Sequence, residues 1–107
     1  MLNDFGEVFQ SSVKDGISNT LGEIVMDSLK QLLKTPLTEY AIDPTGFHRD
    51  LQRIFASASS TLEKMIVKEL FQKLRLHYSS ELDFEASINL ARQDAMLSKR
   101  KIRTQMP

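Results

Sequence analysis

The sequence contains no cysteine, and only four glycines and three prolines occur among its 107 residues. Without cysteine the chain forms neither a disulfide framework nor a thiolate metal site, which fits a reducing compartment. The glycines, at positions 6, 16, 22 and 46, do not make a dinucleotide-binding or Walker-type loop, in which backbone amides cradle phosphate. The sequence therefore gives no support to nucleotide-dependent chemistry.

Long apolar runs are also missing. The longest uninterrupted stretches have three apolar residues, as in Ile24-Val25-Met26, whereas a transmembrane helix needs about twenty. The first ten residues, MLNDFGEVFQ, lack the basic start and the apolar stretch of a signal peptide. We therefore expect no membrane association and a cytoplasmic location.

The charges balance over the whole chain but are unevenly distributed. Fourteen basic and fourteen acidic residues give a net charge of zero, which argues against an overall basic field for nucleic acid. The C-terminal end alone is strongly basic, with Lys99, Arg100, Lys101 and Arg103 among the last nine residues. This run has two interpretations: it contacts a partner or nucleic acid, or it is a solvated helix end whose cations complement the helix dipole.

Apolar residues recur at helical spacing along most of the chain, and hardly any alternate with a period of two. The sequence therefore predicts an all-α fold, a compact bundle of four to five short helices. Helices are expected to begin at Asp4, Thr20, Asp43, Ser60 and Ser80.

Local signals set the predicted helix ends. Thr20 and Ser60 each precede a glutamate by three residues, which is typical of a capping box. Asp43-Pro44 combines an N-cap aspartate with proline at the first helical position. Gly16 is expected to end the first helix, and the small residues 56–60 are expected to form a turn.

These signals divide the chain into a short N-terminal helix or arm (1–16), a helical domain (17–97) and a basic flexible tail (98–107). The arm carries Phe5, Val8, Phe9 and Val13 in a segment that glycine and serine interrupt. A short amphipathic helix is marginal in water unless something covers its apolar side, and surplus apolar surface tends to mark an interface. We therefore predict a homodimer to which Phe5, Val8, Phe9 and Val13 contribute.

No constellation of residues indicates catalysis. His48 and His77 are 29 positions apart, and neither has a second histidine one helical turn away, as a helical metal site would. Each is interpreted as a surface or half-buried helix histidine. Glu81, Asp83 and Glu85 stand at a predicted helix start, where acidic residues complement the dipole. The sequence thus predicts no catalytic residue, no cofactor-binding residue and no metal ligand, and we expect a protein that is not an enzyme.

Three segments combine into a distinctive pattern of packing residues: 43–51 (DPTGFHRDL), 54–58 (IFASA) and 62–74 (LEKMIVKELFQKL), followed by Asp83-Phe84-Glu85. Over roughly residues 17–90 the chain resembles a family of small archaeal signal-output domains, the Nitrosopumilus output domain group. The family usually has glycine at the turn where this chain has Ala56-Ser57-Ala58. The resemblance implies an archaeal, cytoplasmic, helical module attached to signalling or regulation, with no catalytic residues.

The leading hypothesis is a non-enzymatic helical interaction or regulatory module, a signalling output or adaptor domain with a protein partner. The alternative is a nucleic-acid-binding or transcription-associated protein that uses the basic C-terminal tail. Further basic residues support that alternative: Lys64, Lys68, Arg75 and Arg92. A third hypothesis is a small-molecule sensor with a pocket among aromatic residues, namely Phe47, Phe55, Phe71 and Phe84.

Overall fold

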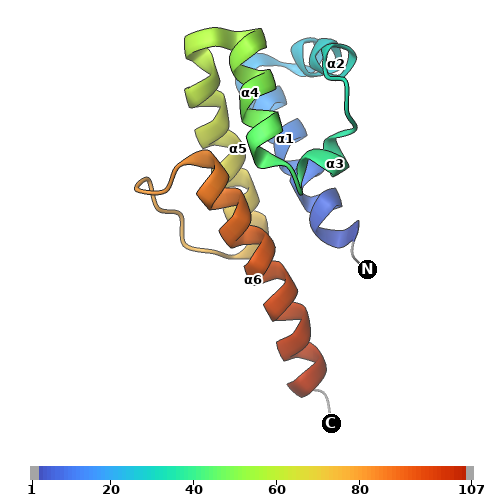
Figure 1. Ribbon diagram of the computed structural model, residues 1–107, viewed down its shortest axis with the longest axis vertical. Helices are drawn as coiled ribbons and strands as arrows, with labels where there is room; N and C mark the ends of the chain where they lie inside the picture. The colour runs from blue at the N-terminus through green and yellow to red at the C-terminus, as the bar shows by residue number, and fades with distance from the viewer. Residues whose placement is uncertain (1–2, 106–107) are drawn as a thin grey trace.

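The computed structural model describes the backbone of residues 3–105 and the side chains of residues 5–97. Six α-helices and one 3-10 turn follow one another, and none of the described residues is in a strand (Figure 1). They are α1 (Asn3–Leu21), α2 (Glu23–Leu32), α3 (Leu37–Tyr40), α4 (Pro44–Phe55), the 3-10 turn η1 (Ala56–Ala58), α5 (Ser59–Leu74) and α6 (Phe84–Gln105). The prediction of an all-α bundle is confirmed.

Helix α1 lies at the centre of the bundle and packs most extensively against α5. Phe5, Phe9, Val13 and Ile17 recur every four residues along its buried face. The predicted boundary between an arm at 1–16 and a domain from residue 17 is wrong, because α1 passes through both. Gly16 does not end the helix: it lies where α1 approaches α5, and a Cβ atom there would be 3.2 Å from the Ile66 Cα.

The break between α1 and α2 falls at Gly22, not at Thr20. Gly22 has a φ of 96°, a conformation that glycine adopts without strain, and its N–H donates to the Ser18 carbonyl. The Thr20 hydroxyl donates back to the Gly16 carbonyl at 2.7 Å, so the predicted capping box is wrong. Because α2 restarts after Gly22, Met26 and Leu29 face the core while Ile24 is 83% exposed.

Helix α4 confirms its predicted start. The Asp43 carboxylate accepts from the Gly46 N–H at 3.1 Å, and Pro44 occupies the first helical position. The turn predicted at 56–60 is also present, with η1 joining α4 to α5. Ala58 precedes α5 and has no side chain able to accept a hydrogen bond, so the capping box predicted at Ser60 is wrong.

Phe47 on α4 is fully buried and joins several helices through ring contacts. Its ring centroid is 5.4 Å from that of Phe9 on α1, 5.1 Å from Tyr40 on α3 and 5.6 Å from Phe84 on α6. The Tyr40 hydroxyl also donates to the Asp50 carboxylate at 2.6 Å. Burial is the main cause that raises the pKa of Tyr40, and the bond to Asp50 adds to it.

Helix α6 begins at Phe84, four residues later than predicted. At this start the Asp83 carboxylate accepts from the Ala86 N–H at 2.7 Å. Its first half packs across α4 and α5, burying Phe84, Ile88 and Ala91. Its second half runs beyond the bundle (Figure 1). The tail predicted over 98–107 overlaps this helix through Gln105, and its side chains lie outside the described residues.

Candidate binding groove

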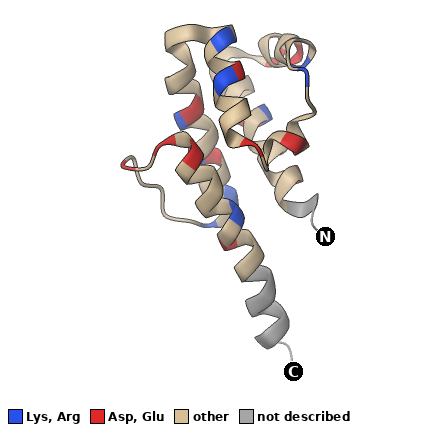
Figure 2. Ribbon diagram, in the orientation of Figure 1, with Lys and Arg blue, Asp and Glu red and all other residues tan. Residues whose placement is uncertain are grey.

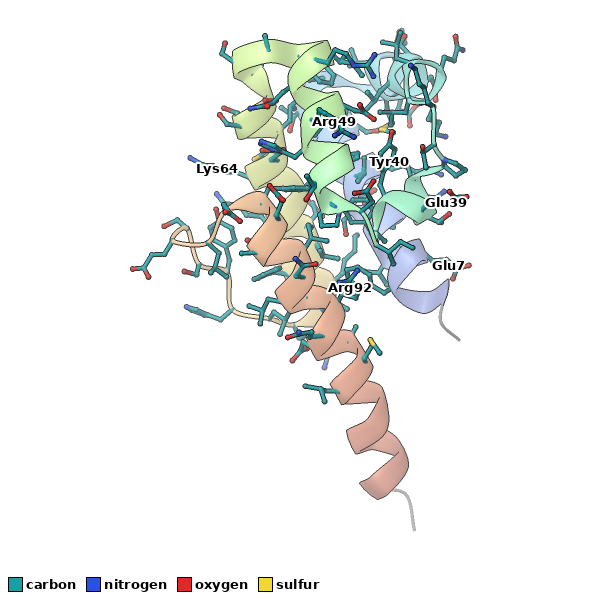
Figure 3. All side chains as sticks on the ribbon, in the orientation of Figure 1. Glu7, Glu39, Tyr40, Arg49, Lys64 and Arg92 are labelled. Carbon is teal, nitrogen blue, oxygen red and sulfur yellow. The ribbon has the colours of Figure 1, made fainter. Side chains whose placement is uncertain are left out.

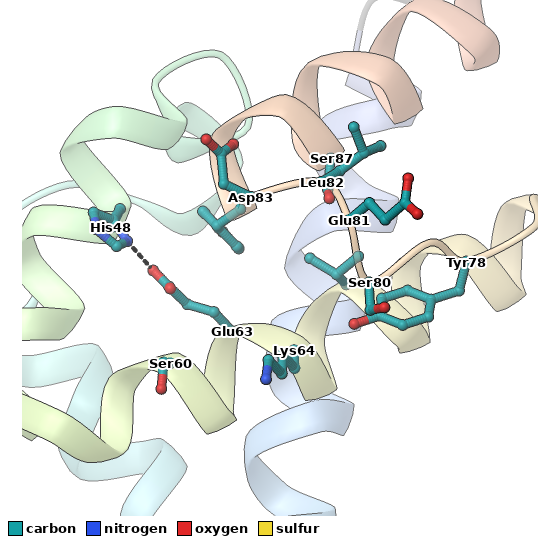
Figure 4. Close-up of a pocket in the computed structure, with 12 residues that line it drawn as sticks. His48, Ser60, Glu63, Lys64, Tyr78, Ser80, Glu81, Leu82, Asp83 and Ser87 are labelled. Atoms are coloured by element: carbon teal, nitrogen blue, oxygen red, sulfur yellow. Dashed lines mark hydrogen bonds and ion pairs between the residues drawn. The ribbon is translucent and has the colours of Figure 1, made fainter.

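A groove of about 390 Å³ lies between α4, α5 and the loop that leads into α6. We call it the acidic groove. Three carboxylates line it (Glu63, Glu81 and Asp83), with one lysine, Lys64, at its edge (Figure 4). Tyr78 and Phe84 provide aromatic surface, and three serine hydroxyls complete the polar lining: Ser60, Ser80 and Ser87.

His48 and Glu63 form a hydrogen-bonded pair at the inner end of the groove. His48 projects from α4 and its Nδ1 contacts the Glu63 Oε2 on α5, as the dashed line in Figure 4 shows. The His48 ring also stacks against Phe84, with centroids 6.4 Å apart and an interplanar angle of 24°. Two neighbouring helices therefore fix the orientation of the imidazole, whose side chain is 33% exposed.

Glu63 is an unusual residue for this position, because its side chain is only 8% exposed. Burial raises the pKa of the Glu63 carboxyl, and the negative charges of Asp83 and Glu85 raise it further. The hydrogen bond from His48 and its charge act in the opposite direction. The ionised carboxylate is thus only partly compensated by its own neighbours.

One carboxylate oxygen of Glu63 is engaged by His48. Among the described residues this hydrogen bond uses Oε2, and no buried side-chain oxygen or nitrogen there lacks a partner. Glu63 is one of the residues that line the groove, so its carboxylate offers a hydrogen-bond acceptor to a ligand that enters.

The rim of the groove is also acidic. Glu81, Asp83 and Glu85 cluster at the loop and first turn of α6, which appear red in Figure 2. Asp83 caps the helix, and the Glu85 carboxylate accepts from the Thr45 hydroxyl of α4. Glu81 is exposed. The helix-start role predicted for these residues therefore holds for Asp83 and for Glu85, which is in the first turn of α6, and the cluster gives the groove its negative charge.

The predicted basic residues do not come together. Lys64 and Lys68 are exposed residues of α5, and Arg75 follows the end of that helix, whereas Arg92 on α6 pairs with Asn89. Figure 3 shows Lys64 and Arg92 on separate parts of the molecule. Lys68 is already engaged, with its Nζ 5.5 Å from the centre of the Tyr78 ring. The basic tail, with Lys99, Arg100, Lys101 and Arg103, belongs to the opposite end of α6 from the groove.

The residues predicted for self-association are mostly internal. Phe5, Phe9 and Val13 are buried in the core of the same chain, and Val8 packs against it. Their assignment to a subunit contact is corrected, because α5 and α3 already cover this face of α1. The aromatic set of the sensor hypothesis is also core: Phe47, Phe71 and Phe84 are buried and Phe55 is half-buried.

Sequence reasoning interpreted Glu63 as part of a capping box and missed its place in the groove. Its burial could have been predicted from its spacing to apolar residues. Glu63 lies four residues before Val67 and seven before Leu70, which puts it on the buried side of α5. A charged residue on such a stripe needs a partner, but the sequence does not show that His48 supplies it.

The pair can exchange a proton, but no nucleophile accompanies it in the described part of the chain: none of the groove serines is hydrogen-bonded to His48. Within the same residues, no group of three or more acidic, histidine or cysteine side chains has an arrangement that could hold a metal ion. None of the described helices has both the length and the apolar character needed to cross a membrane. Comparisons with family models, curated proteins and solved structures give no match for this chain.

Proposed function

We propose that the protein is a non-enzymatic helical interaction module and that the acidic groove binds a basic segment of a protein partner. The carboxylate of Glu63 carries this proposal: it lines the groove, its side chain is only 8% exposed, and its hydrogen bond to His48 uses one of its two oxygens. A buried carboxylate with only one partner gains from a second positively charged donor. A lysine or arginine side chain supplies such a donor.

The surroundings of Glu63 suit a basic side chain. Glu81 and Asp83 add negative charge at the rim, and Tyr78 and Phe84 offer aromatic faces along which the apolar stem of lysine or arginine packs. The contact between Lys68 and Tyr78 is an example of the same chemistry within the chain. A regulatory role agrees with the resemblance to archaeal signal-output domains, and we propose a cytoplasmic location on the same grounds.

The test is the binding of a short labelled peptide rich in lysine and arginine, followed by fluorescence anisotropy. Glu63→Gln removes the buried charge, and we expect it to weaken binding about tenfold, as the loss of one charge-assisted hydrogen bond predicts. Glu69→Gln is the matched control, because Glu69 is on the same helix outside the groove, 3.9 Å from Lys73. No binding at low salt, or equal losses for both variants, would contradict the proposal.

Nucleic-acid binding is the second candidate, because the last turns of α6, at the opposite end of the helix from the acidic groove, contain four basic residues. It predicts salt-dependent binding of random duplex DNA that disappears when residues 98–107 are removed. The interaction module predicts that the same duplex does not bind at physiological salt. The peptide and the duplex measured side by side thus separate the two functions.

A further inference from the structure

We propose that the basic segment which fills the acidic groove is the C-terminal end of α6 from a second copy of this chain, so that two α6 helices pair in antiparallel orientation. This inference rests on the proposed function, since it names the partner of the same groove. It replaces the N-terminal segment, whose apolar side chains are internal, with a different dimer surface.

The first argument is the exposed apolar side of α6. Leu90 and Leu97 are 45% and 52% exposed, and a spacing of seven residues places them on the same face of the helix. Met96, one position before Leu97, is 53% exposed. Met96 and Leu97 are in the half of α6 that runs beyond the bundle (Figure 1), whereas Leu90 is on the exposed side of the half that packs against it. Apolar side chains arranged in this way favour a contact with another molecule.

The second argument is charge complementarity between the two ends of α6. The acidic groove and its rim carry Glu63, Glu81, Asp83 and Glu85, whereas the last turns carry Lys99, Arg100, Lys101 and Arg103. The chain as a whole has no net charge. If the basic end of each copy contacts the acidic groove of the other, both sets of charges are neutralised without any third component.

The third argument is reach. Helix α6 has 22 residues, which at 1.5 Å per residue makes it about 33 Å long. The acidic rim is at its first turn and the basic run is in its last turns, so as long as α6 remains helical its basic end cannot meet the groove of its own chain. A second chain is needed to bring the two together.

An antiparallel pair satisfies all three observations with one two-fold axis. If the axis passes near residues 92–94, Leu90 of each copy lies opposite Leu97 of the other. The same register sets Glu81, Asp83 and Glu85 near the partner's basic run, Lys99–Arg103. Both grooves are filled by one operation, which closes the dimer and leaves no open end.

Charge reversal tests the pairing on the full-length chain. The first variant reverses the basic end (Lys101→Glu with Arg103→Glu), and the second reverses the rim (Glu81→Lys with Glu85→Lys). We expect light scattering to give a dimer mass for the natural chain and a monomer mass for each variant alone. An equal mixture of the two variants should regain the dimer mass, because each tail then meets an oppositely charged groove.

Two controls make the result specific. Glu7→Lys reverses an exposed charge on α1, distant from α6 in Figure 3, and is expected to leave the dimer intact. Circular dichroism of each variant shows that the helices are retained. Variants that dimerise as strongly as the natural chain, or a mixture that stays monomeric, would overturn the proposal.

The proposed function fails separately from this inference. A natural chain that is monomeric at all concentrations overturns the antiparallel dimer. If such a monomeric natural chain still binds the basic peptide, the groove nevertheless accepts a basic segment and its partner is another protein. If tail-dependent binding to duplex DNA or anionic vesicles appears in place of dimerisation, the basic end has a different ligand and the dimer is rejected.

Discussion

Ala56 has a backbone conformation that residues with a Cβ atom rarely adopt, with φ 52° and ψ −126° where α4 meets η1. Glycine enters this region without strain. We predict that Ala56→Gly raises the free energy of unfolding by about 1 kcal/mol, because the relief of about 1–3 kcal/mol of strain exceeds the entropy that glycine adds to the unfolded chain. Urea unfolding measures the change.

Ala58→Gly is the matched control for Ala56, since Ala58 has a φ of −72° in the ordinary helical region. There glycine brings only its entropic cost, and the free energy of unfolding should fall by about 0.5–1 kcal/mol. A loss of stability at both positions would show that the turn is not strained.

Glu63 is predicted to make stability depend on pH. Burial raises the pKa of the Glu63 carboxyl in the folded chain, so the protonated form favours folding and this contribution is lost as pH rises through the raised value. Relative to Glu63→Gln, the natural chain should lose stability as pH rises above 4.5, the ordinary pKa of a glutamate. Urea unfolding at several pH values measures this difference.

The groups that face Glu63 set the conditions of that measurement. They are His48 on α4, which lowers the pKa of Glu63, and Asp83 and Glu85 at the start of α6, which raise it. Glu69→Gln, outside the groove, corrects for the general loss of a carboxylate from α5. A difference between the natural chain and Glu63→Gln that stays constant, or that grows in favour of the natural chain as pH rises, contradicts the assignment.

At the scale of elements, Gly16 shows why a helix signal in the sequence was misread. In isolation, alanine is the better helix former by about 1 kcal/mol. Here a Cβ atom would lie 3.2 Å from both the backbone N and the Cα of Ile66, so α1 and α5 would have to separate. We predict that Gly16→Ala lowers the free energy of unfolding by about 1–3 kcal/mol, the usual cost of overpacking.

Asn19→Ala separates packing from helix propensity, because Asn19 is an exposed residue on the same helix. It should raise stability by a few tenths of a kcal/mol. Thermal unfolding of both variants gives the comparison. If Gly16→Ala is as stabilising as Asn19→Ala, the close approach of the two helices at this point is not present.

The sequence correctly predicted a helix end where that end depends only on neighbouring residues. Asp43-Pro44 fixed the start of α4 because both the cap and the proline act on neighbouring backbone. Thr20 failed because its hydroxyl had an alternative local acceptor, the Gly16 carbonyl. Gly16 failed because its role is set by Ile66, fifty residues later in the chain. Contacts between residues so far apart in the chain cannot be predicted from the neighbouring residues alone.

The same reasoning applies to the acidic groove at the scale of the molecule. Its residues come from α4, α5 and the loop before α6, and the sequence identified them separately as a helix histidine, two capping residues and an acidic helix start. Each local interpretation accounts for one residue. Only the packing of three elements shows that His48 meets Glu63 and that the acidic rim stands above them.

The central position of α1 leads to a prediction for the whole molecule. An N-terminal arm would be removable, whereas the structure buries Phe5, Phe9 and Val13 of this segment against α5 and α3. Burial of each such side chain contributes about 1.5–3 kcal/mol, and their sum is comparable with the whole stability of a domain, about 5–15 kcal/mol. Deletion of residues 1–16 also exposes the side chains that α1 covers.

We therefore expect the shortened chain to show no cooperative thermal transition by circular dichroism. Deletion of residues 98–107, from the end of α6 beyond the bundle, is the control and should retain the transition. A cooperative transition after removal of residues 1–16 would contradict the central role of α1.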